Sequence, residues 1–200
     1  MEARLPPRRL LTCAAALVLL AVLASGCGGG SSDAHAATKK DPPAVQYTSQ
    51  DLSFTHPAAW VAYANRWHPP VLHFHPLVYL STQPIHSPCS THGNATTCGL
   101  PVDHLQPGGV LAYWEFNELP IAGPIKLTGK QVRVDGHPAG FEDAAGGACR
   151  RIGADRTVEA TVELGKDSLI SLTACLRGPG LAQSEKSLDA LLASTKFLSQ

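Results

Sequence analysis

Residues 156–175 read RTVEATVELGKDSLISLTAC, and this stretch decides the fold class. Apolar and polar residues alternate over 156–164, and the alternation resumes over 168–175. Between the two runs, Gly165-Lys166-Asp167 has the composition of a turn. Because side chains of a strand alternate between two faces, the pattern predicts an antiparallel β-hairpin. The residues predicted to face inward are Val158, Ala160, Val162 and Leu164.

Similar strand signals occur before this hairpin. Residues 109–116 read GVLAYWEF and predict a central strand that turns Trp114 and Phe116 to the same face. In the strand expected at 71–82, Pro76 predicts a bulge or a break, because proline has no amide hydrogen to donate. Asp135-Gly136 predicts a tight turn. Further strands are expected at residues 52–56, 131–134 and 138–141.

Towards the C-terminus the apolar period changes. Leucines at 181, 188, 191 and 192 recur at helical spacing and predict an amphipathic helix over residues 182–194. Strands followed by a helix predict an α+β fold: mainly an antiparallel β-sheet with a packed C-terminal helix.

Composition narrows the function classes. The 200 residues contain 16 Lys plus Arg and 16 Asp plus Glu, so the formal net charge is zero. Without clustered basic charge we expect no nucleic-acid partner. A hydrophobic content of 44% with 16% charged residues excludes wholesale disorder.

The N-terminal residues have the layout of an export signal. Arg4, Arg8 and Arg9 precede an uncharged run over residues 10–23. Leu23-Ala24-Ser25-Gly26 before Cys27 resembles a bacterial lipobox, and the resemblance implies that the signal peptide 1–26 is removed and Cys27 is lipidated. The alternative is an ordinary signal peptide that is cut after Ala24 or Gly26.

The sequence after Cys27 predicts two further parts. Residues 27–50 are rich in Gly, Ser, Lys and Pro without an apolar period, which is typical of a flexible tether. Residues 51–200 are expected to form a single α+β domain. With a lipidated Cys27, this domain would be held at the extracytoplasmic face of the cell membrane.

The four cysteines that remain after the lipobox predict disulfides. Cys89, Cys98, Cys149 and Cys175 are an even number in an exported chain, which indicates two bonds with three alternative pairings. Loop closure favours Cys89–Cys98, which leaves Cys149–Cys175. A four-cysteine zinc site is the alternative, although the chain has no C-x-x-C pair.

Several short motifs in residues 52–198 carry a family resemblance. The motifs are SFTHP at 53–57 followed by Trp60, VYLST at 78–82, PGGV at 107–110, VDGHPA at 134–139 and LLASTKF at 191–197. With these motifs the chain resembles small actinobacterial lipoproteins of unassigned function, and more distantly the Mog1/PsbP-type α/β/α sandwich. The resemblance implies an antiparallel sheet covered by helices, and it brings no catalytic residues.

Two groups of residues are candidate binding sites. Six of the nine histidines lie within residues 68–104, and His73 and His75 would share one strand face, a spacing that suits copper or zinc. The alternative is a pair of strand-edge histidines beside a disulfide loop. Trp60, Tyr63 and Trp67 are candidates for an aromatic groove that binds a glycan or a peptide. Their spacing also fits one turn of helix that faces the core.

Enzyme signatures do not occur in the sequence. It contains no G-x-S-x-G, H-E-x-x-H, Walker A or G-x-G-x-x-G motif. We therefore expect a lipid-anchored extracytoplasmic module without catalysis or cofactor, which binds or supports another envelope protein or a glycan. The alternatives are envelope metal binding through residues 68–104 and a hydrolase whose site has no sequence signature.

Overall fold

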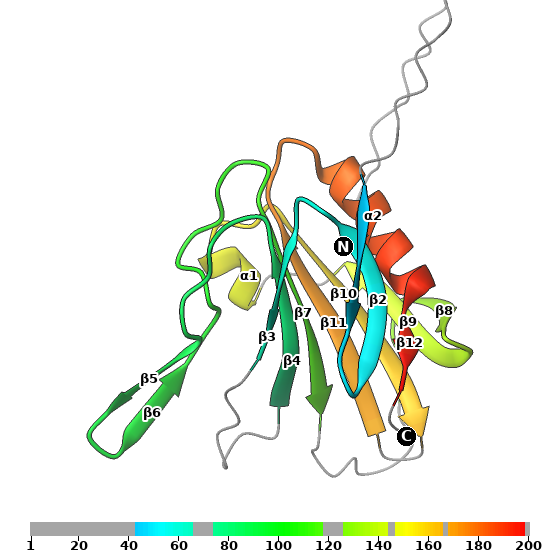
Figure 1. Ribbon diagram of the computed structural model, residues 1–200, viewed down its shortest axis with the longest axis horizontal. Helices are drawn as coiled ribbons and strands as arrows, with labels where there is room; N and C mark the ends of the chain where they lie inside the picture. The colour runs from blue at the N-terminus through cyan, green and yellow to red at the C-terminus, as the bar shows by residue number, and fades with distance from the viewer. Residues whose placement is uncertain (1–42, 66–73, 118–125, 144–146, 166–167, 199–200) are drawn as a thin grey trace, which may run out of the picture. The chain divides into compact units, whose positions relative to one another are not determined.

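A computed structural model of the chain describes residues 43–65, 74–117, 126–143, 147–165 and 168–198. Over these residues the strands form three antiparallel sheets (Figure 1). The seven-stranded sheet has the spatial order β3 (Val61–Ala64), β4 (Phe74–Ser81), β7 (Val110–Asn117), β11 (Ser168–Leu176), β10 (Arg156–Gly165), β9 (His137–Asp143) and β8 (Lys130–Val134). A three-stranded sheet contains β1 (Ala44–Thr48), β2 (Leu52–Pro57) and β12 (Lys196–Phe197). The third sheet is the hairpin β5 (Cys89–His92) and β6 (Ala95–Cys98).

Strands β10 and β11 confirm the hairpin that the alternation predicts. They pair antiparallel from Arg156↔Leu176 to Gly165↔Ser168. Val158, Ala160 and Val162 are buried on one face, as predicted. The register shifts between Glu163 and Gly165, so the strand bulges at Leu164, which is partly buried against the same core.

The predicted irregularity at Pro76 is a β-bulge. The pairing of β4 with β7 shifts register between Pro76 and Val78. Asn65, just after β3, donates from Nδ2 to the Pro76 carbonyl at 2.7 Å. The side chain therefore satisfies a backbone acceptor beside the bulge, where ladder pairing is disrupted.

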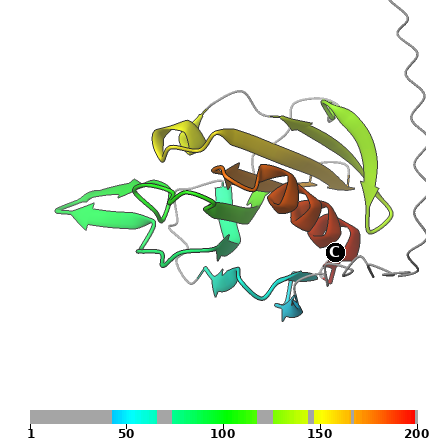
Figure 2. The same cartoon turned by 90° about the horizontal axis from the view of Figure 1, so that it is seen from above.

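The first hydrophobic core lies on one face of the seven-stranded sheet. Trp114 and Leu172 of the sheet share this core with Phe54 of β2 and with Leu188 and Leu191 of α2 (Leu181–Ser194). The Trp114 indole is fully buried and meets Phe197 of β12 edge to face at 5.9 Å. Figure 2 shows α2 between the large sheet and the strands β1 and β2. The C-terminal helix is thus present one residue earlier than predicted.

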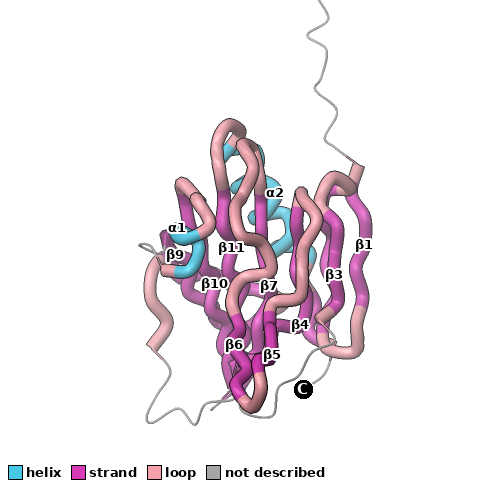
Figure 3. Tube along the Cα trace, turned by 90° about the vertical axis from the view of Figure 1, so that its left-hand side faces the viewer, coloured by secondary structure: helices cyan, strands magenta, loops and turns pink. Residues whose placement is uncertain are grey.

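A second, smaller core lies on the opposite face. Leu111 and Cys175 of the sheet meet Val102 and Leu105 of the preceding loop, and Ile152 next to α1 (Ala148–Arg151). Figure 3 shows α1 and the β5–β6 hairpin on the viewer's side of the sheet, with α2 behind it. Different elements therefore cover the two faces of the seven-stranded sheet, and the second core covers only part of its face.

Two predictions about the N-terminal half are wrong. Residues 44–48, which the composition assigned to the tether, form the edge strand β1, because Tyr47 stacks on Phe54 with ring centroids 5.0 Å apart. The alternative for Trp60, Tyr63 and Trp67, one turn of helix, is also not formed at Trp60 and Tyr63, and Trp67 lies outside the described residues. A turn at Pro57, whose carbonyl accepts from the Trp60 amide, leads directly into strand β3.

Side-chain hydrogen bonds connect the C-terminus to the β8–β9 turn. This turn is the predicted Asp135-Gly136 pair, in which both residues have positive φ. Asp135 accepts from Lys196 Nζ at 2.8 Å and from the Phe197 amide at 2.9 Å. The two hydrogen bonds hold the pKa of the Asp135 carboxyl below its ordinary value.

A candidate binding face on the large sheet

The predicted metal ligands do not assemble within the described residues. His73 lies outside them, and His75 is in β4, where its charge acts on Glu115. His86 lies 3.3 Å from Asp103, between Nε2 and Oδ1, and His104 contacts Arg177. In the described part of the chain no group of three His, Cys, Asp or Glu side chains could hold a metal ion.

The predicted aromatic groove is not formed by Trp60 and Tyr63. Trp60 is only 5% exposed and belongs to the first core, so a ligand cannot reach it. Tyr63 packs against the second core instead. Trp67 and the lipidation candidate Cys27 lie outside the described residues.

Tyr63 is the first member of a row of side chains that crosses the large sheet. It pairs with Tyr79 of β4, and Tyr79 pairs with Tyr113 of β7. The row continues through Thr173 of β11 to Glu159 of β10. Residues that pair across antiparallel strands point to the same face. The rings of Tyr79 and Tyr113 are 5.7 Å apart and tilted by 48°.

A second carboxylate lies on the same face. Glu115 follows Tyr113 by two residues in β7 and pairs with Ser171 of β11. Ser171 in turn pairs with Thr161, whose hydroxyl donates to Glu159 Oε1 at 3.5 Å. We call Tyr63, Tyr79, Tyr113, Glu115 and Glu159 the tyrosine–glutamate face.

The surroundings of Glu115 disfavour its negative charge. Burial raises the pKa of its carboxyl, the nearby charge of Glu159 raises it further, and His75 acts in the opposite direction. No Lys or Arg of the described residues contributes to this pKa. Among the described residues only a histidine offsets the like charge near this half-buried carboxylate, so its ionisation is costly in the free protein.

The tyrosines supply hydroxyl donors beside this carboxylate. Burial raises the pKa of both Tyr79 and Tyr113, so both phenols stay protonated at neutral pH. Tyr79 is 4% exposed and is a buried member of the second core, whereas Tyr113 is only partly buried against that core. The charge of Glu115 raises the pKa of both phenols further. The face therefore combines a poorly compensated carboxylate with protonated phenols.

Carboxylates beside tyrosine rings can recognise a positively charged group. Two carboxylates attract an ammonium or guanidinium group, and tyrosine rings also favour cations over their faces. Groups with perturbed pKa values in partly buried positions are typical of functional sites. The geometry thus supports binding of a positively charged group.

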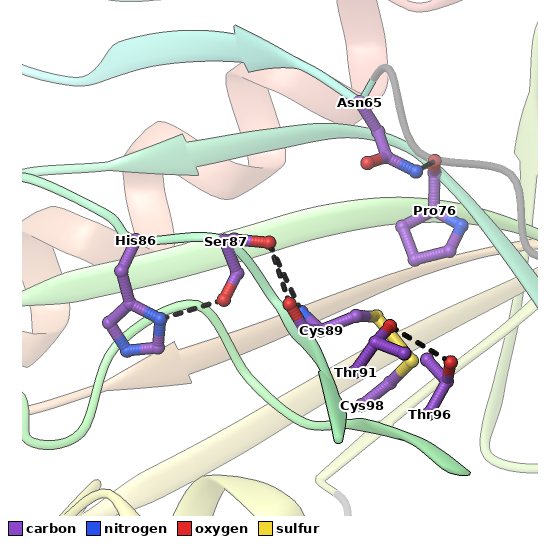
Figure 4. The surroundings of a disulfide bond; sticks show 8 residues. All are labelled: Asn65, Pro76, His86, Ser87, Cys89, Thr91, Thr96 and Cys98. Atoms are coloured by element: carbon purple, nitrogen blue, oxygen red, sulfur yellow. Dashed lines mark hydrogen bonds between the residues drawn. A yellow bond between two sulfur atoms is a disulfide. The ribbon is translucent and has the colours of Figure 1, made fainter. Parts of the chain in front are cut away.

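The β5–β6 hairpin is a second exposed feature on this side of the sheet. Its strands are closed by the Cys89–Cys98 disulfide, one of the two predicted pairings (Figure 4). Ser87 Oγ donates to the Cys89 carbonyl at 2.9 Å, and the hydroxyls of Thr91 and Thr96 are 3.1 Å apart. The hairpin belongs to neither hydrophobic core, so the disulfide replaces burial as its main support.

Comparisons with known proteins return no relative. No family model matches the chain, no curated protein matches it, and no solved structure matches it. Among the described helices, neither is long and apolar enough to span a bilayer.

The glutamates of this face were not predicted as site residues. The sequence signal that could have indicated them is the alternation in the strand at 109–116, where Tyr113 and Glu115 alternate with buried residues. A glutamate in a predicted central strand is informative, because charged residues rarely occupy such positions without a partner. Its neighbour Glu159 could be found only from the strand order, since 44 residues separate the two positions.

Proposed function

We propose that this protein is a lipid-anchored, extracytoplasmic, non-catalytic module that binds a cationic group of another cell-envelope component through the tyrosine–glutamate face. One observation carries the proposal. The carboxylate of Glu115 is half-buried on the same sheet face as Glu159, whose charge raises its pKa, and no described Lys or Arg acts on that pKa.

A bound cation would relieve the electrostatic cost of this arrangement. An ammonium or guanidinium group would be attracted to both carboxylates. Ionised Glu115 is unfavourable in the unbound protein, and the bound cation would offset this cost in the complex. The same reasoning disfavours an anionic or purely apolar partner.

The extracytoplasmic location is supported by the chemistry of the cysteines. Disulfides persist in oxidising compartments and are rare in the cytosol, and both cysteine pairs of the described domain are at bonding distance. The lipobox-like residues before Cys27 supply the anchor in this proposal. Mass spectrometry of the membrane fraction tests this part: a diacylglyceryl group on an N-terminal Cys27 is expected, and an unmodified, freely soluble chain would contradict it.

A peptide titration of the purified full chain tests the binding face. The probes are acetyl-Gly-Lys-Gly-amide, acetyl-Gly-Arg-Gly-amide and the neutral acetyl-Gly-Gln-Gly-amide. We expect the two charged peptides to shift the NMR signals of Tyr113 and Thr173, and the neutral peptide to leave them unchanged. Added salt should weaken the binding, because it screens charge pairs.

Two variants make this experiment decisive. Glu115→Gln keeps the shape of the side chain and is expected to weaken binding of the charged peptides about tenfold, the value of one charge-assisted hydrogen bond. Asp189→Asn, on the exposed side of α2, is the matched control and should change nothing. Equal binding of the neutral and charged peptides, or an unchanged affinity of Glu115→Gln, would refute the proposed face.

The partner itself is identified in intact cells. A photo-reactive amino acid placed at Tyr63, at the margin of the face, should cross-link a specific envelope component. The same residue placed at Asp189 should not cross-link that component. A single band that depends on Glu115 is the expected result, and identical cross-links from both positions would contradict a specific face.

A further inference from the structure

A separate pocket lies between strands β1 and β2 and helix α2, on the first-core side of the large sheet. It has a volume of about 190 Å³. Its strand side is formed by Ala44, Thr55, His56 and Pro57, and its helix side includes Gln183 and Ser187. An engineered apolar cavity of about 150 Å³ holds benzene, so this pocket has room for a single ring. None of its residues belongs to the tyrosine–glutamate face.

The orientation of His56 determines what the pocket can bind. The ring is 6% exposed, and its Nδ1 lies 2.9 Å from the Pro57 carbonyl oxygen. A carbonyl only accepts, so Nδ1 carries the hydrogen and, in the neutral ring, Nε2 presents a lone pair. Phe54, with its ring centroid 6.1 Å away, packs beside the imidazole. Within the described residues Nε2 has no hydrogen-bond partner, although the ring lines the pocket.

The two hydroxyls of the pocket are also acceptors. The Thr55 hydroxyl donates to Ser194 Oγ at 2.9 Å, and Ser194 donates onward to the Leu191 carbonyl. The Ser187 hydroxyl donates to the Gln183 carbonyl at 3.0 Å. Both hydroxyl hydrogens are therefore used within the protein, and their oxygens keep lone pairs. Lys186 adds a positive charge to the lining, which disfavours a protonated amine.

We propose that this pocket binds a small, neutral, ring-sized molecule that carries a hydroxyl group, and that the hydroxyl donates to Nε2 of His56. Ala44, Pro57 and Ala190 supply apolar walls for the ring. A ligand hydroxyl would give the Nε2 lone pair the hydrogen-bond partner that it lacks among the described residues. The proposal is independent of the cation-binding face, because the two sites share no residue.

Phenol and anisole form a pair of probes, because anisole carries a methyl group in place of the hydroxyl hydrogen of phenol and so cannot donate. We expect phenol to bind the full-length protein with millimolar affinity. Shifts of the NMR signals of Thr55 and Ser187 measure this binding. Anisole should bind about tenfold more weakly, since it cannot donate to Nε2. Equal binding of the two compounds would overturn the role of His56, and no binding of phenol would overturn the site.

Three variants complete the test. His56→Phe removes the acceptor and keeps a ring, so phenol should bind it no better than anisole does. Ala190→Leu, at an exposed helix position, should fill the pocket and abolish binding of both compounds without disturbing the core. The control His92→Phe, at the tip of the β5–β6 hairpin, should bind as the parent does. If Ala190→Leu still binds phenol at the parent affinity, the ligand lies elsewhere and the proposal fails.

Discussion

The two disulfides occupy opposite kinds of surroundings. Cys149–Cys175 connects α1 to β11 inside the second core, and its cysteines are 2% and 0% exposed. Cys89–Cys98 closes a hairpin whose strands are almost entirely exposed and which contacts neither core. The first bond therefore links elements that hydrophobic packing already holds together, whereas the second holds a structure that packing does not. The same bond type serves global stability in one region and local shape in the other.

The largest effect is expected from removal of the buried bond. The double variant Cys149→Ala, Cys175→Ala should lower the free energy of unfolding by about 2 to 5 kcal/mol, as for native disulfides of small secreted domains. The bond joins residues 26 positions apart, and its loss removes the covalent link between α1 and β11. Urea denaturation of the parent and the variant under non-reducing conditions measures the change. A shift below about 0.5 kcal/mol would mean that α1 contributes little to the core.

The contacts of Asp135 with the C-terminal strand should contribute less to stability than the buried disulfide and more than the exposed one. Asp135→Ala removes the acceptor of Lys196 and of the Phe197 amide, at a cost of about 1 kcal/mol. Because the folded-state pKa of Asp135 is lowered, its stabilisation is complete above the ordinary carboxyl pKa of 3.8 and is lost as the pH falls through the folded value. The deficit of the variant should therefore be present at pH 7 and disappear in acid. Thermal unfolding across this pH range measures it, with Asp189→Asn as the control.

Removal of the exposed bond should change global stability least among the covalent and ionic connections. For Cys89→Ser, Cys98→Ser we expect a change in the free energy of unfolding within about 0.5 kcal/mol. Because an isolated two-stranded hairpin is only marginally stable, the hairpin should instead open locally. Hydrogen exchange should then lose protection at Ser90 and Thr97, which pair across the hairpin, and proteolysis should begin within residues 90–97. A global destabilisation as large as that of the buried pair would show that the hairpin supports the core.

Substitution of Glu115 in the binding face should raise the free energy of unfolding, whereas the preceding substitutions lower it or leave it unchanged. Its folded-state pKa is raised, so the folded protein binds a proton more tightly than the unfolded chain does between the ordinary value of 4.5 and the folded value. Stability from this group consequently falls as the pH rises through that window. Glu115→Gln should be slightly more stable than the parent at pH 7 and equal to it below pH 4.5, as measured by thermal unfolding. A loss of stability at pH 7 would mean that the ionised carboxylate has a partner in the free protein.

The sequence predicted the elements whose signals are local. The alternation over 156–175, the bulge at Pro76, the Asp135-Gly136 turn and the leucine period of α2 depend on neighbouring residues, and the structure has each of them. The pairing of Cys89 with Cys98 also followed from short loop closure. Strand β1 was missed, because its main support is the contact of Tyr47 with Phe54, which composition does not reveal.

The candidate sites could not be predicted because they depend on strand order. The tyrosine–glutamate face joins β3, β4, β7 and β10, and no periodicity within one strand indicates which strands become neighbours. Trp60 and Tyr63 illustrate the same limit: close in sequence, they belong to different cores. His56 was likewise noted only within a strand motif, and its exposure to a pocket depends on a helix more than a hundred residues later.

Strand β1 has a mechanical consequence. It is the first described element of the chain, and it lies at the edge of its sheet. Among the described strands, it pairs with β2 alone. A sideways pull on residue 43 would act first on the hydrogen bond from the Ala58 amide to the Pro43 carbonyl. It would then open the Ala44–Pro57 pair and successive pairs until it reached the Tyr47–Phe54 stack. Since Ala44 and Pro57 also line the His56 pocket, such traction would loosen that pocket before it loaded the seven-stranded sheet.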